Sequence, residues 1–539
     1  MLWKRIGELT LVGLLIAPPI ALLIWAKWVI IKFELVKPYG NDLKDAAKVA
    51  FSAPNLQSIS VGSITIALGL TIGFLGLLYL FENPHRRKRS HIRGVDIVSK
   101  KVLVRAADEN TLRNRFRHLA EARKFSNIQI NPSQVLKQRV EQVTIAGVPI
   151  PKKLEPVHFL IGGTPGAGKS VTIKEVVSAA KKRGDRMIIC DPNAEYFSLF
   201  GNKDDIVMNP FDLRFPGWSI FNEIRSSYDA ERYARSVIPD GRNANDQEWH
   251  GYAQFLFQET ILKLKEEGHK STDTLINYLC SMPIEQLGLY LDNTVAIGLF
   301  DQGANKALSS TRFILTKYLS THKHLHDGDF SLRDWLEKDT SNLFITWRQD
   351  MADALRPLIS TWFDVLITST LSMPFKSGDY EPQPLWFVCD ELASLERLSS
   401  LEDGLTKGRK HGARFLCGIQ STAQLDDIYG REKATTLRSC FRNAFYLNIP
   451  STDPQTAEEF SKGIGEREYI RIERSTTRVQ GGVNYSKAKR HVKERAVLPS
   501  EIHELPDLTG YLCLAGNYPI SRVTLQPRIY PTLNTPFVE

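Results

Sequence analysis

A glycine-rich loop carries the clearest chemical signal in the sequence. It matches the pattern G-x-x-x-x-G-K-[ST] and consists of Gly163, Thr164, Pro165, Gly166, Ala167, Gly168, Lys169 and Ser170. Glycines allow the backbone N–H groups of such a loop to surround phosphate oxygens, and the following helix N-terminus adds partial positive charge. Lys169 is expected to reach the β- and γ-phosphates, and Ser170 to ligate Mg²⁺. The loop therefore predicts a site for ATP and Mg²⁺.

A pair of acids follows a second apolar run. Residues 385–389 (LWFVC) end in Asp390 and Glu391. An apolar strand that ends in Asp is typical of a Walker B element, whose Asp holds the Mg²⁺ shell. The adjacent Glu391 is placed to polarise an attacking water as a general base. An apolar run ending in two acids is common by itself, and it gains weight here from the glycine loop.

Two further residues are candidates near the transferred phosphate. A third apolar run, residues 414–419, ends at Gln420, which can contact the γ-phosphate or the attacking water from the strand beside Walker B. Arg409 lies just before that run. It is either an ordinary surface cation or an arginine that enters a neighbouring subunit's site. The acids of residues 191–195 (DPNAE) either face the nucleotide or form a loop and helix cap.

The elements that position these residues indicate an α/β fold. Residues 157–161 read as a strand, 170–182 as a helix and 187–191 as a second strand, with the glycine loop between the first two. This is a βαβ unit, for which right-handed parallel pairing of the two strands is expected. We predict a RecA-like P-loop nucleotide-binding domain.

An insertion divides this predicted domain. Residues 226–335 have helical periodicity and little strand-like alternation, so they predict an all-α domain. The residues alone are consistent with an insert that serves packing. The resulting domain assignment is an anchor at 1–90, the two parts of the nucleotide-binding domain at 91–225 and 336–539, and the all-α domain at 226–335.

Two apolar runs near the N-terminus predict transmembrane helices. Residues 10–31 and 61–81 are each long enough to cross a bilayer, although a cleaved signal peptide is an alternative for the first. Lys4 and Arg5 precede the first run, and the basic block 86–89 follows the second. The positive-inside rule then places both termini in the cytoplasm. The block 86–89 reads as a stop-transfer flank, or as a contact for anionic lipid or nucleic acid.

Composition sets wider bounds. The 539 residues carry a formal net charge of +9, which permits but does not require nucleic acid or anionic lipid as a partner. Six cysteines stand singly without a CxxC pair, so neither a zinc site nor a disulfide framework is indicated. The spacing His322-x-His324-x-His326 favours a solvated helix end over a metal site. The basic stretch 471–495 is either a phosphate contact or a mobile surface hairpin.

Several of these segments together resemble a known family. They are GTPGAGKS at 163–170, DPNAEYF at 191–197, VMNPFD at 207–212, WFVCDELASLERLSSL at 386–401, GRKHGARFLCGIQSTAQLDDIYG at 408–430 and LPDLTGYLCLAGNYP at 505–519. With the two N-terminal apolar runs, they resemble the type IV secretion coupling proteins, the TraD/TrwB/VirD4-like branch of the FtsK–HerA translocases. The 408–430 block is the most specific of them.

The resemblance implies a homo-hexameric ring in the bacterial inner membrane, with ATP hydrolysed between subunits and Arg409 acting in trans. It also implies that the ring takes a relaxase-bound DNA complex to a type IV secretion channel during conjugation. The DNA is expected to be single-stranded and bound without sequence preference. Two other functions remain open: a chromosomal DNA translocase of the same superfamily, and a membrane scaffold that recruits cargo and uses nucleotide only to assemble.

Overall fold

The computed structural model describes residues 90–111, 114, 140–301, 305–374, 382–479 and 482–539. The predicted transmembrane segments 10–31 and 61–81 and the basic block 86–89 lie outside these ranges. Within them, no helix combines the length and apolar character that a membrane crossing needs. The chain divides into two units, one containing residues 469–490 and the other residues 92–468 and 491–539. The site described below lies entirely in the second.

A large mixed sheet organises the second unit. In the described part of the chain it has ten strands in the order β2-β15-β14-β11-β5-β10-β9-β6-β8-β7. β14 pairs antiparallel with both β11 and β15, and the other seven pairs of neighbouring strands are parallel. The strands are β2 Ile97–Val98, β5 Phe159–Gly162, β6 Arg186–Pro192, β7 Ile206–Met208, β8 Leu343–Trp347, β9 Leu385–Cys389, β10 Ala413–Ile419, β11 Asn443–Tyr446, β14 Thr509–Cys513 and β15 Ile520–Thr524. The predicted α/β class is therefore confirmed.

Both faces of this sheet are covered, which explains why its central strands are buried at every position and almost entirely apolar. All residues of β5, β9 and β10 are buried. Their side chains alternate between two core clusters. Ile161 and Val388 belong to one with helices α4 and α7, whereas Leu160 and Phe387 belong to the other with helices α15 and α16. The alternation fixes the register of the strand ends that carry the site.

The helices have the following bounds: α4 Lys100–Ala107, α7 Lys169–Arg183, α8 Glu195–Phe200, α9 Ser227–Val237, α10 Ala244–Glu266, α11 Thr272–Ile276, α12 Ile284–Tyr290, α13 Asn305–Leu319, α14 Leu332–Lys338, α15 Ala352–Ser372, α16 Leu401–Lys407, α17 Thr422–Tyr429, α18 Arg431–Cys440, α19 Pro454–Ile464 and α20 Pro499–His503. Two short 3₁₀ helices, η2 Lys152–Val157 and η9 Gly408–His411, also border the sheet.

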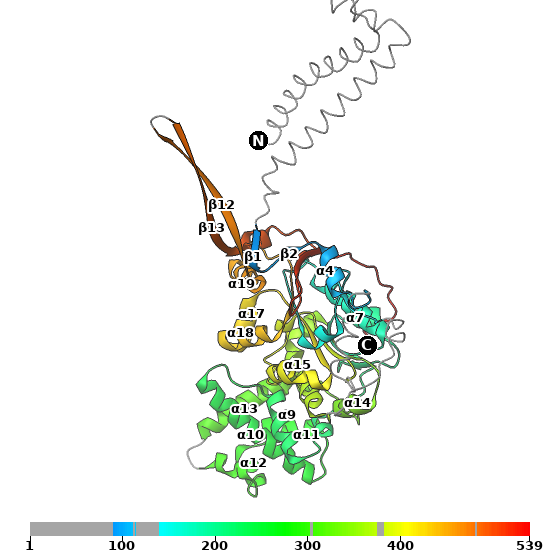
Figure 1. Cartoon of the computed structure of the whole chain (residues 1–539). Helices are drawn as coiled ribbons and strands as arrows, with labels where there is room; N and C mark the ends of the chain where they lie inside the picture. The colour runs from blue at the N-terminus through cyan, green and yellow to red at the C-terminus, as the bar shows by residue number, and fades with distance from the viewer. Residues whose placement is uncertain (1–89, 112–113, 115–139, 302–304, 375–381, 480–481) are drawn as a thin grey trace, which may run out of the picture. The chain divides into compact units, whose positions relative to one another are not determined.

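The described residues from α9 to α14 form helices and turns, shown in green in Figure 1. A buried carboxylate joins this segment to the rest of the second unit. Glu223 accepts hydrogen bonds from the N–H groups of Leu332 and Arg333 at the start of α14, and from the indole of Trp218. The domain boundaries at 226 and 335 remain a prediction.

One expectation about the strands was wrong. β5 and β6 belong to the same sheet, but β10 and β9 lie between them, so they do not pair. The connection from β5 through α7 to β6 therefore passes over β9 and β10, which begin more than 190 residues after β6 ends. Local spacing carries no information about strands inserted from so far along the chain. β10 does lie beside β9, as the sequence predicted.

Two small sheets complete the described structure. β3 (Thr144–Ile145) and β4 (Val148–Pro149) pair antiparallel. β12 (Glu466–Val479) lies between β1 (Ser90–Gly94) and β13 (Gly482–Arg495) in the other. The basic stretch 471–495 falls largely within β12 and β13. There Arg490 pairs with Glu473, and Lys493 with Glu466, so part of its positive charge is balanced within the strands.

Candidate nucleotide site

The carboxyl ends of three neighbouring strands bring the predicted residues together. In the sheet, β10 lies between β5 and β9, and Ile419 pairs with Gly162 while Cys417 pairs with Cys389. The next residues along these strands are Gly163, Gln420 and Asp390. Because the three strands are parallel, the glycine loop, the Gln and the two acids emerge at one edge of the sheet. Ligands of open α/β sheets bind at such an edge.

The glycine loop has the backbone that phosphate binding requires. Gly166 and Gly168 have φ values of +82° and +118°, which favour glycine. A Cβ at Gly168 would also lie 2.7 Å from a methyl carbon of Leu525. The loop is tied to β11 because the Thr164 N–H donates to the Asn448 carbonyl at 3.1 Å. The first amides of α7 have no acceptor within their own helix and are available to an anion.

Lys169 lies within the loop that it is expected to serve. Its side chain is buried, and Nζ donates a hydrogen bond to the Gly163 carbonyl at 2.8 Å. Burial lowers the pKa of Lys169, and the charges of Glu391 and Asp390 oppose that shift. The structure thus places the ammonium close enough to both acids for their charges to act on it, as the sequence motifs require.

Asp390 is held by a residue that the sequence analysis did not single out. The hydroxyl of Tyr196, in α8, donates to Asp390 Oδ2 at 2.8 Å. The backbone around Asp390 is equally constrained, because a Cβ at Gly418 would lie 1.9 Å from the Asp390 carbonyl oxygen. Only glycine permits β10 to approach this closely. Tyr196 lies within the DPNAEYF segment, and a tyrosine in a short helix gave no sign of this contact.

Glu391 is a half-buried residue whose carboxylate oxygens are turned away from solvent. Both side-chain oxygens are shielded from solvent, and neither has a hydrogen bond of good geometry within the described residues. Burial raises the pKa of Glu391, while the nearby Gln420 side chain and the Lys169 charge oppose the shift. A buried acid with unmet hydrogen-bonding capacity is costly to stability and is typical of a functional position.

The acids of residues 191–195 have other roles in this structure. Both oxygens of the buried Asp191 carboxylate accept backbone N–H groups from the start of α8, at 2.9 Å from Tyr196 and 2.6 Å from Phe197. Glu195 pairs with Lys174. These contacts favour the helix-cap interpretation. Asp191 acts on the site indirectly, because the helix that it caps carries Tyr196.

Arg409 lies away from its own glycine loop. It belongs to η9, which precedes β10, whereas Gln420 follows the same strand. At about 3.3 Å per residue, the seven residues of β10 separate the two edges of the sheet by roughly 20 Å. Arg409 is exposed. It therefore cannot assist phosphate chemistry at the glycine loop of its own chain.

The three spaced histidines occupy different surroundings. His322 is buried, His324 packs against Phe211, and His326 packs against Phe215. Within the described ranges, no group of three or more His, Cys, Asp or Glu side chains is arranged to hold a metal ion.

The match to a family model identifies this arrangement. Residues 142–526 match the model described as the type IV secretion-system coupling protein DNA-binding domain. The chain belongs to the type IV coupling-protein family. The matched range includes the glycine loop, Tyr196, Asp390, Glu391, Gln420 and Arg409, so the candidate site lies within the part that defines membership.

Individual relatives agree. Coupling protein TraD of Escherichia coli K12 is 32% identical over 429 residues, which cover 76% of this chain and 58% of TraD. The type IV secretion system-coupling protein VirD4 of Bartonella henselae is 22% identical over 401 residues, which cover 66% of this chain and 60% of VirD4. The chain thus spans about three fifths of the length of these curated relatives.

Solved structures show the same fold. The bacterial conjugative coupling protein TrwBΔN70 is 43% identical to this chain, with a TM-score of 0.73 and coverage of 83% of this chain and 97% of that one. TrwB has also been solved in complex with ADP and Mg²⁺, with 43% identity, a TM-score of 0.72 and the same coverage.

Proposed function

We propose that this chain is a membrane-anchored ATPase that drives DNA transfer in bacterial conjugation. The observation that carries the proposal is the solvent-shielded Glu391 carboxylate, whose pKa is raised by burial and on which Gln420 and Lys169 both act, at the strand edge where the glycine loop emerges. A site that only bound nucleotide would not need a second acid next to Asp390 that is shielded from solvent and has a raised pKa. The proposal is supported by the likeness to TraD and TrwB, whose names describe coupling proteins.

Each residue has a separate role in the proposed hydrolysis. The amides of the glycine loop and Lys169 bind the β- and γ-phosphates. For Lys169 this means exchanging its bond to the Gly163 carbonyl for phosphate oxygens. Glu391 accepts a proton from water as the water oxygen bonds to the γ-phosphorus and the bond to the ADP oxygen breaks. Gln420 orients that water from the adjacent strand.

The side chains present fit an Mg²⁺ ion at this site. Ser170 is half-buried at the start of α7, and Asp390 Oδ2 is fixed by Tyr196. Oxygen donors of this kind suit Mg²⁺, and TrwB has been solved with ADP and Mg²⁺. When bound, the ion would neutralise charge that develops on the phosphates.

The remaining parts of the proposal concern assembly. Arg409 cannot reach its own glycine loop, so we assign it to the site of a neighbouring chain in a homo-hexameric ring. Residues 10–31 and 61–81 would anchor the ring in the inner membrane, and residues 226–335 would form an all-α domain. The partners would be single-stranded DNA, a relaxase complex and a type IV secretion channel.

The proposal is tested with the full-length purified chain. ATP hydrolysis is measured with and without single-stranded DNA for the wild type and for Lys169→Ala and Glu391→Gln. We expect DNA to stimulate the wild type and both variants to lose hydrolysis. Glu391→Gln should still bind ATP, because its phosphate-binding loop is intact. Glu432→Gln is the matched control, since Glu432 is exposed on α18, and it should hydrolyse ATP at the wild-type rate.

Two results would count against the motor. Hydrolysis that persists in Glu391→Gln would show that Glu391 is not the base. A wild-type protein that binds ATP but hydrolyses none in the presence of DNA would favour the scaffold instead.

A further inference from the structure

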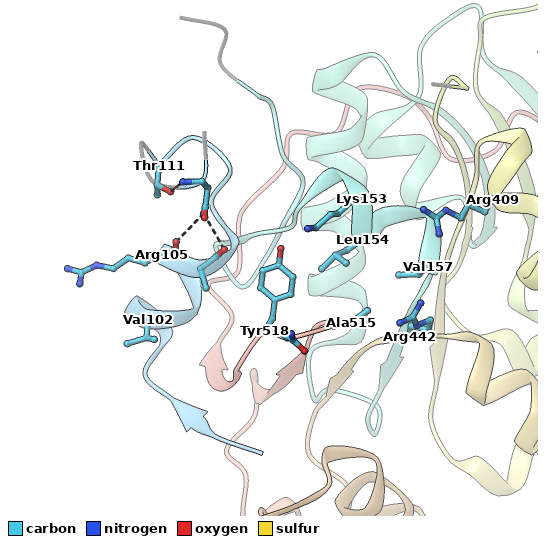
Figure 2. A pocket seen from close by; sticks show the side chains of 14 residues that line it. Val102, Arg105, Thr111, Lys153, Leu154, Val157, Arg409, Arg442, Ala515 and Tyr518 are labelled. Carbon is cyan, nitrogen blue, oxygen red and sulfur yellow. Dashed lines mark hydrogen bonds between the residues drawn. The ribbon is translucent and has the colours of Figure 1, made fainter. Parts of the chain in front are cut away.

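A large cavity lies at the edge of the sheet opposite the glycine loop. Its volume is about 1130 Å³, and its lining includes Lys153, Val157, Arg409, Arg442 and Tyr518 (Figure 2). Val157 precedes β5 by two residues, Arg442 immediately precedes β11, and Arg409 lies just before β10. These three strands are neighbours in the order β11-β5-β10. The cavity is therefore built on the amino ends of three strands, and two of them, β5 and β10, carry nucleotide-site residues at their carboxyl ends.

Two arginines flank the central strand at this edge. Neighbouring strands are about 4.8 Å apart, so the starts of β11 and β10 are separated by roughly 10 Å. Figure 2 shows the guanidinium groups of Arg409 and Arg442 on either side of Val157. Arg105 also lines the cavity, but in the same view its guanidinium group points away from Tyr518 and Lys153. Lys153, Arg409 and Arg442 are therefore the cations that share the space.

Among the described residues, nothing balances the positive charge of this cavity. None of its lining residues is an Asp or Glu. Lys153, Arg409 and Arg442 are all exposed, and no ion pair is found for them among the described residues. The nearby buried arginines behave differently, because Arg183 and Arg414 both pair with Glu155. Three cations gathered in a concave surface without counter-ions favour a ligand with several negative charges.

Hydrogen bonds fix the backbone segments that carry the two arginines, and the Arg442 N–H donates to the Val157 carbonyl at 3.0 Å. His158, which follows Val157, is buried and bridges the segments on both sides of Arg409. Its Nε2–H donates to the Leu405 carbonyl at 2.8 Å, and its Nδ1 accepts the Phe415 N–H at 3.1 Å. Burial lowers the pKa of His158 to about 4, so the ring is neutral at physiological pH. A preformed arrangement of this kind suits the stabilisation of charge in a transition state.

We propose that this cavity receives the phosphate chain of an ATP held in the glycine loop of a second copy of this chain, and that Arg442 acts there beside Arg409. The inference rests on the proposed function, and it adds Arg442, with Lys153 in support, to the half-site that the neighbour completes. A chain's own nucleotide lies at the other edge of the sheet, roughly 20 Å away along β10. Only a second copy can bring its phosphates to these cations.

Single variants give the first test. Arg442→Ala in the full-length protein should lower kcat for ATP hydrolysis by about 100- to 1,000-fold, in the range measured for loss of one charge-stabilising donor. The affinity for ATP should stay within about twofold of wild type, because the variant's own glycine loop is unchanged. Arg442→Lys should recover part of the rate, since an ammonium supplies charge without the bidentate geometry. Lys152→Ala removes an exposed cation outside the cavity lining and should have the wild-type rate.

Mixed rings give the decisive test. Arg442→Ala chains keep an intact glycine loop, and Lys169→Ala chains keep intact cavity cations. Rings that contain both, verified by native mass spectrometry, should hydrolyse ATP several-fold faster than the average of the two unmixed proteins. Replacing the Lys169→Ala chain with the double variant Lys169→Ala/Arg442→Ala should abolish the gain, because no chain then supplies Arg442.

The other outcomes overturn the inference. Mixed rings without a gain would show that Arg442 does not act across subunits, as would a wild type that forms no oligomer. If the Lys169→Ala protein still binds ATP and the double variant Lys169→Ala/Arg442→Ala does not, the cavity binds a free nucleotide instead of a neighbour's. Loss of DNA stimulation alone, with an unchanged basal rate, would indicate a DNA contact. A wild type without ATPase activity would instead refute the proposed function, and the wild-type assay shows this directly.

Discussion

The close approach of β10 to Asp390 gives a sharp prediction for Gly418→Ala. The added Cβ would lie 1.9 Å from the Asp390 carbonyl oxygen, so the contact must open by about 1.5 Å to reach ordinary van der Waals separation. Both partners are backbone, and no flexible side chain can absorb the change. The strand that ends at Gln420 must therefore move relative to Asp390 and Glu391.

This displacement sets the expected magnitude. Misplacing reacting groups by about 1 Å can cost about 10²-fold in rate, and overpacking a core costs about 1–3 kcal/mol of stability. We expect kcat of Gly418→Ala to fall about 100-fold. ATP affinity should fall less, because the glycine loop is also tied to the segment after β11 through the Thr164 N–H and the Asn448 carbonyl. Steady-state ATPase assays and equilibrium binding of a fluorescent ATP analogue measure the two quantities.

A matched variant separates this effect from general damage. Gly298→Ala adds the same methyl group where nothing lies within 4 Å of the new Cβ, so it should hydrolyse ATP like the wild type. A folded Gly418→Ala protein with a wild-type kcat would refute the reasoning, since β10 and Asp390 would then not need their observed spacing.

Three further predictions concern buried charges. Because burial raises the pKa of Glu391, the acidic limb of the pH profile of kcat/KM should lie above the ordinary Glu pKa of about 4.3, as initial rates across pH would show. Glu155→Gln should lower the free energy of unfolding by about 3–5 kcal/mol in denaturant titrations, because it leaves the buried Arg414 without its counter-ion and Arg183 with Asp185 alone. Burial lowers the pKa of His322 to about 4 in the folded protein. As pH falls from about 6.5 to about 4, His322 is protonated in the unfolded chain but not in the folded one, so the free energy of unfolding should fall by on the order of 3 kcal/mol. His322→Leu should remove that loss, measured as the change of thermal midpoint with pH.

Each of these has a control. For the first, the pH profile of Glu391→Asp is compared with that of the wild type. If the acidic limb lies at the same pH in both, the limb does not report the carboxyl group at position 391. A wild-type limb at or below about pH 4.3 would contradict the raised pKa of Glu391. Glu195→Gln breaks a partly exposed pair with Lys174 and should cost less than about 1 kcal/mol. The exposed His326 replaced by Leu should keep the acid sensitivity that His322→Leu loses.

The sequence was informative where a chemical residue directly follows an apolar run. Asp390 and Gln420 follow β9 and β10, and the glycine loop follows β5, so short runs of buried residues located all three. Each strand end is a local feature, and its side chain must emerge at the sheet edge. That is why the carboxyl edge of the site was predictable.

Other features depend on contacts between distant segments. The order β5-β10-β9-β6 requires strands from far along the chain, so the expected pairing of β5 with β6 was wrong. Tyr196 reaches Asp390 across 194 positions, and the Asn448 carbonyl accepts the Thr164 amide through backbone alone. The cavity cations come from three separate segments. None of these has a signature in residue type or spacing.

The central claim is that ATP hydrolysis at this edge of the sheet drives conjugative transfer. The most direct measurement is the transfer frequency from donor cells that lack the native protein and carry Glu391→Gln in its place, with the wild type and Glu432→Gln for comparison. Glu391→Gln should bind ATP, reach wild-type abundance and reduce transfer to the level of the deletion. Transfer at the wild-type frequency by this variant would contradict the account.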